Sequence, residues 1–180
     1  MIIGLDISTA VVGIAVLNDN SEVVDLTYCD LRAKKDFWKK IDAVDQRLND
    51  LSNEYDITKI YVEENLQRFR PGLSSAKTIV TLAKMNGIVS ASARRIFNAL
   101  PTDINVNSAR KVLGISINRK SKVSTKQQVF DQISERIKFD WPIKILKSGP
   151  RKGKKVVDTV SYDMADALVI CQAGILLDIP

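Results

Sequence analysis

The chain has 180 residues, of which 45% are hydrophobic, and its 27 Lys/Arg and 21 Asp/Glu give a formal net charge of +6. We expect residues 1–180 to form one domain, because this length and composition allow a single sizeable core. Histidine is absent, which excludes Ser-His-Asp and Cys-His catalysis and zinc sites built on histidine.

The first 30 residues predict three antiparallel strands. Residues 1–7 and 11–17 are apolar runs, residues 18–21 are turn formers, and residues 22–30 give the third strand. Asp6 interrupts the first run, where burial and β-propensity both disfavour a carboxylate. We therefore interpret Asp6 as a functional residue.

The following segments predict a helix and then a parallel strand. Residues 34–52 place apolar side chains at helical spacing, and residues 58–63 are a short strand that ends in acid. A strand reached through a helical crossover pairs in parallel with the first strand, which would bring Glu63 beside Asp6. Glu63 directly ends the apolar run, so we favour it over Glu64 as the inward carboxylate.

A long apolar helix is expected after a loop at residues 65–73. It begins at Ser74 or Ser75 and ends near Asn98. This helix is apolar on more than one face, which indicates either the core or a subunit interface. The next expected elements are a short strand at residues 101–107, a helical turn at 108–114, a basic loop at 116–124 and an amphipathic helix at 125–138.

The last helix carries two carboxylates, Asp163 and Asp166, which lie on one face because they are three residues apart. Like charges on a largely apolar helix are costly unless a cation or a proton lies between them. The alternative is a solvated helix face. Residues 140–157, which precede this helix, are expected to be irregular, with a basic centre at residues 147–155.

Positive charge is concentrated in residues 110–155, which contain 14 Lys/Arg and 3 Asp/Glu and therefore carry +11. Such a segment is typical of polyanion binding, and a solvated lysine-rich loop is the alternative. The candidate DNA-binding residues in it are Arg110, Lys111, Arg119, Lys120, Lys122, Arg151, Lys152, Lys154 and Lys155.

Three acidic motifs occur along the chain: GLDIST at residues 4–9, IYVEE at 60–64 and DMADA at 163–167. Weaker support comes from NSARKVLG at residues 107–114 and TKQ at 125–127. In this order the motifs resemble those of the RuvC group of Holliday-junction resolvases, within the ribonuclease H-like nucleases, and especially its bacteriophage-type members. The resemblance implies an α/β, ribonuclease H-like fold: a five-stranded mixed sheet, with three antiparallel strands and then parallel strands, flanked by helices.

The resemblance also implies a metal-dependent endodeoxyribonuclease that nicks four-way (Holliday) and other branched DNA junctions symmetrically, leaving 5′-phosphate and 3′-hydroxyl ends. Lys126 would lie near the scissile phosphate, and Lys111, or alternatively Arg110, would be a second basic residue. The alternative for both lysines is a surface position on an amphipathic helix. Two Mg²⁺ or Mn²⁺ ions would offset the repulsion of the carboxylates. The catalytic and metal-binding carboxylates implied are Asp6, Glu63, Asp163 and Asp166.

Members of this group insert an apolar wedge into the junction from the loop after the strand-four acid. Leu66 or Phe69, flanked by Arg68 and Arg70, could serve here, although a phenylalanine packed on the sheet is the ordinary alternative. The group is dimeric, because a four-way junction needs two symmetric nicks. The apolar face of helix 76–93 is our candidate for the two-fold contact.

Cys29 and Cys171 follow no spacing pattern, which indicates reduced, buried thiols in a cytoplasmic protein, or in the host cytoplasm if a phage encodes it. The sequence shows no signal peptide, and no apolar run reaches membrane-spanning length. Three other functions stay open: a nuclease for RNA–DNA hybrids or flaps, an actin-like or sugar-kinase-like ATPase, and a non-catalytic nucleic-acid-binding scaffold.

Overall fold

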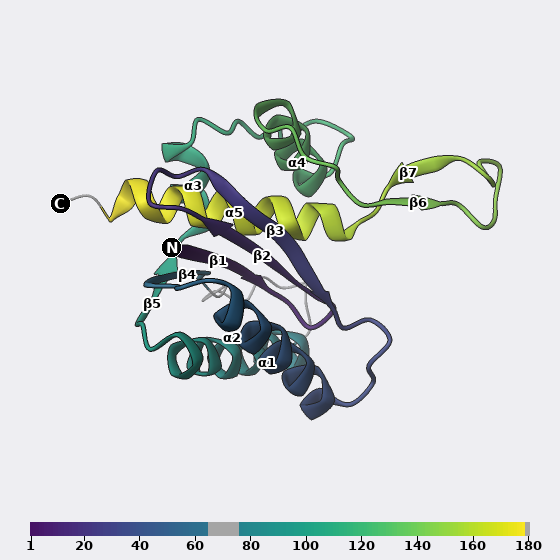
Figure 1. Ribbon diagram of the computed structural model, residues 1–180. Helices are drawn as coiled ribbons and strands as arrows, with labels where there is room; N and C mark the ends of the chain where they lie inside the picture. The colour runs from purple at the N-terminus through teal and green to yellow at the C-terminus, as the bar shows by residue number, and fades with distance from the viewer. Residues whose placement is uncertain (65–75, 179–180) are drawn as a thin grey trace.

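The computed structural model describes residues 1–64 and 76–178. The strands of its central sheet are β1 (Ile2–Ile7), β2 (Val11–Leu17), β3 (Val23–Asp30), β4 (Lys59–Glu63) and β5 (Pro101–Ile104). They are arranged in the order β3-β2-β1-β4-β5 (Figure 1). The pairs β1–β2 and β2–β3 are antiparallel, whereas β1–β4 and β4–β5 are parallel. The expected mixed sheet of five strands is therefore confirmed.

Helices cover both faces of this sheet (Figure 1). On one face lie α1 (Phe37–Glu54) and α2 (Ala76–Phe97). On the other face α5 (Val160–Leu177) crosses β1 and β2, with α3 (Val106–Val112) and α4 (Thr125–Arg136) packed against it. The expected start and end of α1 differ from the observed ones by three and two residues, whereas α4 begins where expected and ends two residues earlier.

The side chains of β1 alternate between two hydrophobic cores, because successive residues of a strand point to opposite faces. Ile3 and Leu5 belong to the core beneath α1 and α2. Gly4 faces α5, and a Cβ placed on it would lie 2.4 Å from the Cβ of Cys171. Only glycine permits such a close approach of helix and strand. Asp6, two residues further on, points to the same side of the sheet.

The boundary between β5 and α3 differs from the expectation because Asn105 is the N-cap of the helix. Its side chain accepts hydrogen bonds from the backbone N–H groups of Asn107 (3.0 Å) and Ser108 (3.2 Å). The helix therefore starts at Val106, and the strand ends at Ile104. The predictions of a strand through residue 107 and of a helix that starts at residue 108 were therefore both wrong.

Residues 140–157 were expected to be irregular, which was also wrong. They contain an antiparallel hairpin of β6 (Ile143–Ile145) and β7 (Lys155–Val157). Ile143 pairs with Val157, and Ile145 pairs with Lys155. The strands have three residues each, too few for a clear alternating pattern, and the Gly/Pro/Lys-rich tip between them hides the pairing. The hairpin projects from the body beyond the N-terminal end of α5 (Figure 1).

One further expectation fails for α5. By length and composition this helix could cross a membrane, so the expectation of no such apolar run was wrong. However, 67% of it is buried inside the protein, where it packs on β1, β2 and α4. This degree of burial is typical of a helix in the core of a globular protein.

Candidate active site

Four predicted carboxylates come from three elements of the fold. Asp6 is in β1, Glu63 ends β4, and Asp163 and Asp166 lie near the start of α5. The register of the parallel pair β1–β4 places Asp6 and Glu63 next to each other on neighbouring strands. The two carboxylates are close enough for each to shift the pKa of the other. The structure thus brings together the acids that the sequence places far apart.

The ammonium group of Lys126 lies among three of these carboxylates. Its Nζ is 2.5 Å from Oδ1 of Asp163, 3.6 Å from Oδ2 of Asp166 and 3.8 Å from Oδ2 of Asp6. Partial burial by itself lowers the pKa of Lys126, but the surrounding carboxylates outweigh this effect and raise the pKa above its ordinary value. The lysine therefore stays protonated among the acids.

The carboxylates of Asp6 and Asp166 are buried, at 6% exposure each. Burial raises the pKa of Asp6 well above its usual range, and the charge of Glu63 raises it further. Burial, followed by the charge of Asp6, raises the pKa of Asp166 to about 7. Burial also raises the pKa of Glu63. The neighbouring positive charges thus do not offset the burial and mutual repulsion of these acids, and the site favours an additional proton or cation.

The donor set fits a magnesium or manganese site, because these ions prefer carboxylate oxygens. Oδ2 of Asp6 and Oδ1 of Asp166 are buried and lack a hydrogen-bond partner among the described residues. Buried acceptors without partners are costly, and a cation would satisfy them. In residues 1–64 and 76–178 no group of three His, Cys, Asp or Glu side chains is arranged to hold a metal ion. The Lys126 ammonium lies among the acids and forms an ion pair with Asp163.

Two residues to which the sequence analysis gave no role in the site, Tyr162 and Gln127, hold α4 on α5 and thereby position Lys126. The hydroxyl of Tyr162 donates a hydrogen bond to Oε1 of Gln127. The Tyr162 ring also packs edge-on against Phe130, with 5.3 Å between ring centroids. Tyr162 precedes Asp163, and Gln127 follows Lys126 in the sequence. Adjacency to two candidate site residues is the signal that could have found them.

Asn86, in α2, was also missed. It is 6% exposed, and its side-chain amide donates to the backbone carbonyl of Glu63 at 3.0 Å from the opposite face of the sheet. This bond holds the end of β4 in place. A buried amide in an apolar helix was the available signal. Glu64, the carboxylate that we did not favour as the inward one, is half-buried and accepts a hydrogen bond from the side chain of Asn105 at 2.8 Å.

Of the two alternative basic residues, Arg110 lies nearer to the acids. Its positive charge opposes the rise in pKa of both Glu63 and Asp166, and its Nε is buried without a partner among the described residues. Lys111 is exposed. Both side chains line a hollow of about 710 Å³ together with Arg119. Three basic side chains are therefore gathered around this hollow.

The other predicted DNA-binding residues lie in two places. Lys120 and Lys122 are exposed in the loop before α4. The hairpin residues are exposed as well, namely Arg151, Lys152, Lys154 and Lys155. The candidate wedge residues and their neighbours lie outside the described residues, namely Leu66, Arg68, Phe69 and Arg70.

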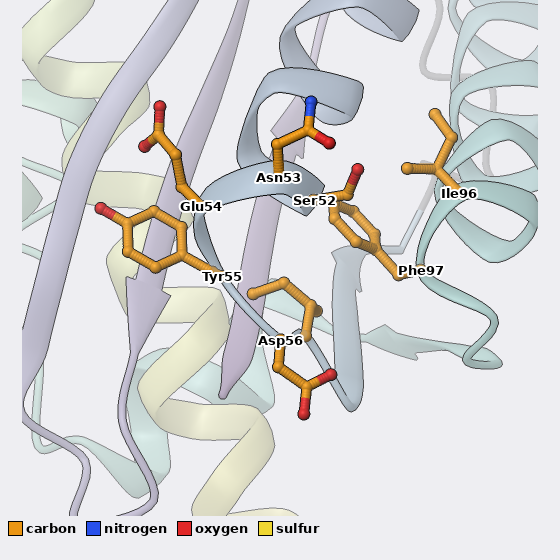
Figure 2. A pocket seen from close by; sticks show the side chains of 8 residues that line it. Ser52, Asn53, Glu54, Tyr55, Asp56, Ile96 and Phe97 are labelled. Carbon is orange, nitrogen blue, oxygen red and sulfur yellow. The ribbon is translucent and has the colours of Figure 1, made fainter.

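A separate hollow of about 260 Å³ lies where α1 ends and β4 begins (Figure 2). Tyr55, Asp56 and Phe97 are among its lining residues. It is at the opposite end of β4 from Glu63, and none of the predicted site residues lines it. This hollow is therefore not part of the acidic site.

No family model matches the sequence, and no curated protein matches it. Among solved structures, Thermus thermophilus RuvC in complex with a Holliday junction substrate is similar, with a TM-score of 0.63 and 13% identity over 98% of this chain and 93% of that one. Another T. thermophilus RuvC structure has a TM-score of 0.60 and 13% identity, over 98% of this chain and 94% of that one. The yeast mitochondrial Holliday junction resolvase Ydc2 has a TM-score of 0.50 and 20% identity, over 96% of this chain and 76% of that one. The chain has the RuvC-type, ribonuclease H-like fold that its motifs imply.

Proposed function

We propose that this chain, which has the fold of RuvC, is a metal-dependent endodeoxyribonuclease that resolves four-way and other branched DNA junctions by symmetric nicking. The observation that carries this proposal is the Lys126 ammonium held between Asp163, Asp166 and Asp6. The descriptions of similar structures, a junction complex and a junction resolvase, support the choice of substrate.

The reaction is phosphodiester hydrolysis. The oxygen of water bonds to phosphorus, the bond from phosphorus to the 3′-oxygen breaks, and the water proton ends on that oxygen, which leaves 5′-phosphate and 3′-hydroxyl ends. When bound, two Mg²⁺ or Mn²⁺ ions supply charge neutralisation and an activated water. The residues that would hold them are Asp6, Glu63, Asp163 and Asp166.

Lys126 and the basic residues have separate roles in this proposal. Lys126 is half-exposed, at 51%, and its four-carbon side chain is flexible, so its ammonium can bind an oxygen of the scissile phosphate. Arg110, Lys111 and Arg119 line the neighbouring hollow and would hold the adjacent phosphates. Positive charge beside the acids is needed because the substrate is itself a polyanion.

The homodimer in this proposal is formed through α2. Val80 is 66% exposed, and Ala83, Gly87 and Ala91 continue an exposed stripe of small side chains along the helix. A Cβ on Gly87 would meet no described atom within 4 Å, so the protomer itself does not require glycine there. A helical glycine costs about 1 kcal/mol relative to alanine. Close packing against a second α2 would account for it and give two sites for paired nicks.

Two further parts of the proposal rest on sequence features. Kinship with the bacteriophage-type members rests on the acidic motifs. A place in the cytoplasm, or in the host cytoplasm, rests on the two free cysteines, Cys29 and Cys171.

The deciding experiment is a cleavage assay on a labelled four-way junction with and without Mg²⁺ or Mn²⁺. Duplex, flap and RNA–DNA hybrid substrates of matched sequence are the controls. Paired, symmetric, metal-dependent nicks in the junction support the proposal. Cleavage confined to the hybrid or the flap would instead indicate the alternative nuclease. Binding of DNA without any cleavage would indicate a non-catalytic scaffold.

A further inference from the structure

The β6–β7 hairpin carries an unusual concentration of positive charge. Residues 143–157 contain six Lys/Arg and no Asp/Glu, which gives them a formal charge of +6, equal to that of the whole chain. Those that are exposed are Lys147, Arg151, Lys152, Lys154 and Lys155. The remaining cation, Lys144, lies 3.8 Å from Asp158 at the base of the hairpin. The charge is therefore concentrated toward the tip.

The tip has a defined shape rather than that of a free loop. Beyond the two strands, the backbone of Leu146 donates to Lys154 at 3.0 Å, and Gly153 donates to Leu146 at 2.8 Å. Gly149 and Gly153 have φ values of 78° and 85°, which glycine adopts without strain. The hydrogen-bonded ribbon thus continues into the basic segment.

The base of the hairpin is fixed to the start of α5. The backbone carbonyl of Pro142 accepts hydrogen bonds from the backbone of Asp158 (2.8 Å) and the hydroxyl of Ser161 (3.1 Å). The ring of Trp141 packs edge-on against Phe130 of α4, with 5.0 Å between centroids. This end of α5 also carries Asp163, so the hairpin extends outward from the acidic site (Figure 1).

One face of the ribbon is apolar and open to solvent. Ile143 and Ile145 are 59% and 58% exposed, and Lys155 is paired with Ile145 on the same face. Exposed isoleucines beside lysines suit a partner that offers both negative charge and apolar surface. A nucleic acid duplex does so through its phosphates and through its sugars and base edges.

We propose that the β6–β7 hairpin is an arm that binds the double-stranded DNA leading away from the nicked strand. A two-stranded ribbon fits the major groove of DNA, and exposed cations bind phosphates on either side. The seven residues from Ile143 to Gly149 span roughly 20 Å, or about six base pairs. This inference rests on the proposed function, because the acidic site determines where the nicked strand lies.

The test measures binding of four-way junctions with short arms (about 8 base pairs) and long arms (about 20 base pairs) in the presence of chelator. The variants are a triple neutralisation, K152Q/K154Q/K155Q, and a hairpin deletion in which two glycines replace residues 144–156. The matched control is K34Q/K35Q/K39Q, which removes three exposed lysines on the α1 side of the sheet. Circular dichroism and thermal unfolding check that each variant folds.

For the wild-type protein we expect tighter binding to long arms and a hydroxyl-radical footprint about six base pairs longer than that of the deletion variant. The triple neutralisation should weaken binding to long arms about tenfold and reduce the slope of log K against log salt by about 2–3. The control should retain the preference for long arms.

The inference that the hairpin binds DNA would be wrong if the wild-type protein and both folded variants bind the junction with equal footprints and equal salt slopes. That result would leave the proposed nuclease function standing. Absence of any junction binding by the wild-type protein would overturn the proposed function and the arm together. A third variant, I143S/I145S, tests the protein-interface alternative. If it changes the oligomeric state in light scattering and leaves DNA binding unchanged, the ribbon is a contact between protomers, and the inference is wrong.

Discussion

Gly13 of β2 lies so close to α5 that a Cβ placed on it would be 2.0 Å from the carbonyl oxygen of Asp163. In the sheet, Gly13 is paired with Asp6 of β1. The glycine therefore allows the helix to approach the sheet beside Asp6. This approach lets Asp6 and Asp163 reach the same ammonium group on Lys126.

Replacing Gly13 with alanine should move the start of α5 away from the sheet. We expect a loss of about 1–3 kcal/mol in the free energy of unfolding, as for other overpacked sites, and a larger relative loss of junction cleavage. Urea unfolding and the cleavage assay measure the two effects. Asn53→Ala, at an exposed position near the end of α1, is the control. A Gly13→Ala protein as stable and as active as the wild type would contradict this account of how the acids converge.

The sheet and the acidic cluster were predictable because their signals are local. The apolar runs, the crossover helix and the acids in β1, β4 and α5 determine strand order and direction, and parallel strand ends meet at one edge of the sheet. The central sheet observed follows that expectation. The acids then converge through this topology, and Lys126 enters the cluster from α4.

Other features depend on tertiary contacts that no sequence pattern encodes. Asn105 is the N-cap of α3, although Ser108 was an equally good candidate by residue type. The β6–β7 hairpin is joined to the start of α5 by hydrogen bonds to the carbonyl of Pro142. The bond between Tyr162 and Gln127 joins two helices whose packing was not predicted. Such hydrogen bonds join segments that are far apart in the sequence, so they can be identified only once the fold is known.

Asp6→Asn and Asp166→Asn should each abolish junction cleavage while junction binding survives. An amide is a poor substitute for a carboxylate at a magnesium site, whereas loss of negative charge does not weaken attraction to DNA. We expect rates at least about 10³-fold lower in the cleavage assay and unchanged or tighter binding in a filter assay. Asp103→Asn, at an exposed position of β5, is the control. Wild-type cutting by either variant would show that the site is assigned wrongly.

Lys126→Gln should destabilise the metal-free protein at neutral pH, because it removes the cation between Asp163, Asp166 and Asp6. The half-exposed lysine limits the expected loss to about 1–3 kcal/mol. Urea unfolding in chelator measures it, and added Mg²⁺ should recover part of the loss by replacing the missing charge. Lys122→Gln, which removes an exposed lysine from the nearby loop, should have little effect. Equal losses in the two variants would mean that the ammonium does not hold the acids together.

The stability of the metal-free protein should depend on pH through Asp166. Its pKa of about 7 in the folded protein lies above the ordinary value, so the folded state binds more protons between about pH 4 and pH 7. The contribution of Asp166 to the free energy of unfolding is therefore present at low pH and lost as the pH rises through 7. Asp166→Asn should remove this dependence, by an amount on the order of a few kcal/mol. Chemical unfolding at several pH values in chelator measures it, and Asp42→Asn, at an exposed position, should leave the wild-type dependence in place.

Val80→Lys should dissociate the proposed homodimer without unfolding the protomer. Val80 is 66% exposed, so a lysine at this position is solvated in the isolated protomer, whereas two lysines facing each other across a two-fold contact would repel. We expect the molar mass from light scattering to fall from that of two chains to that of one, and junctions to be nicked on one strand at a time. Val24→Lys, which places the same charge at an exposed valine of β3, should remain dimeric. If Val80→Lys stays dimeric, or if the wild-type protein is a monomer that still makes paired nicks, α2 is not the contact that couples the two cuts.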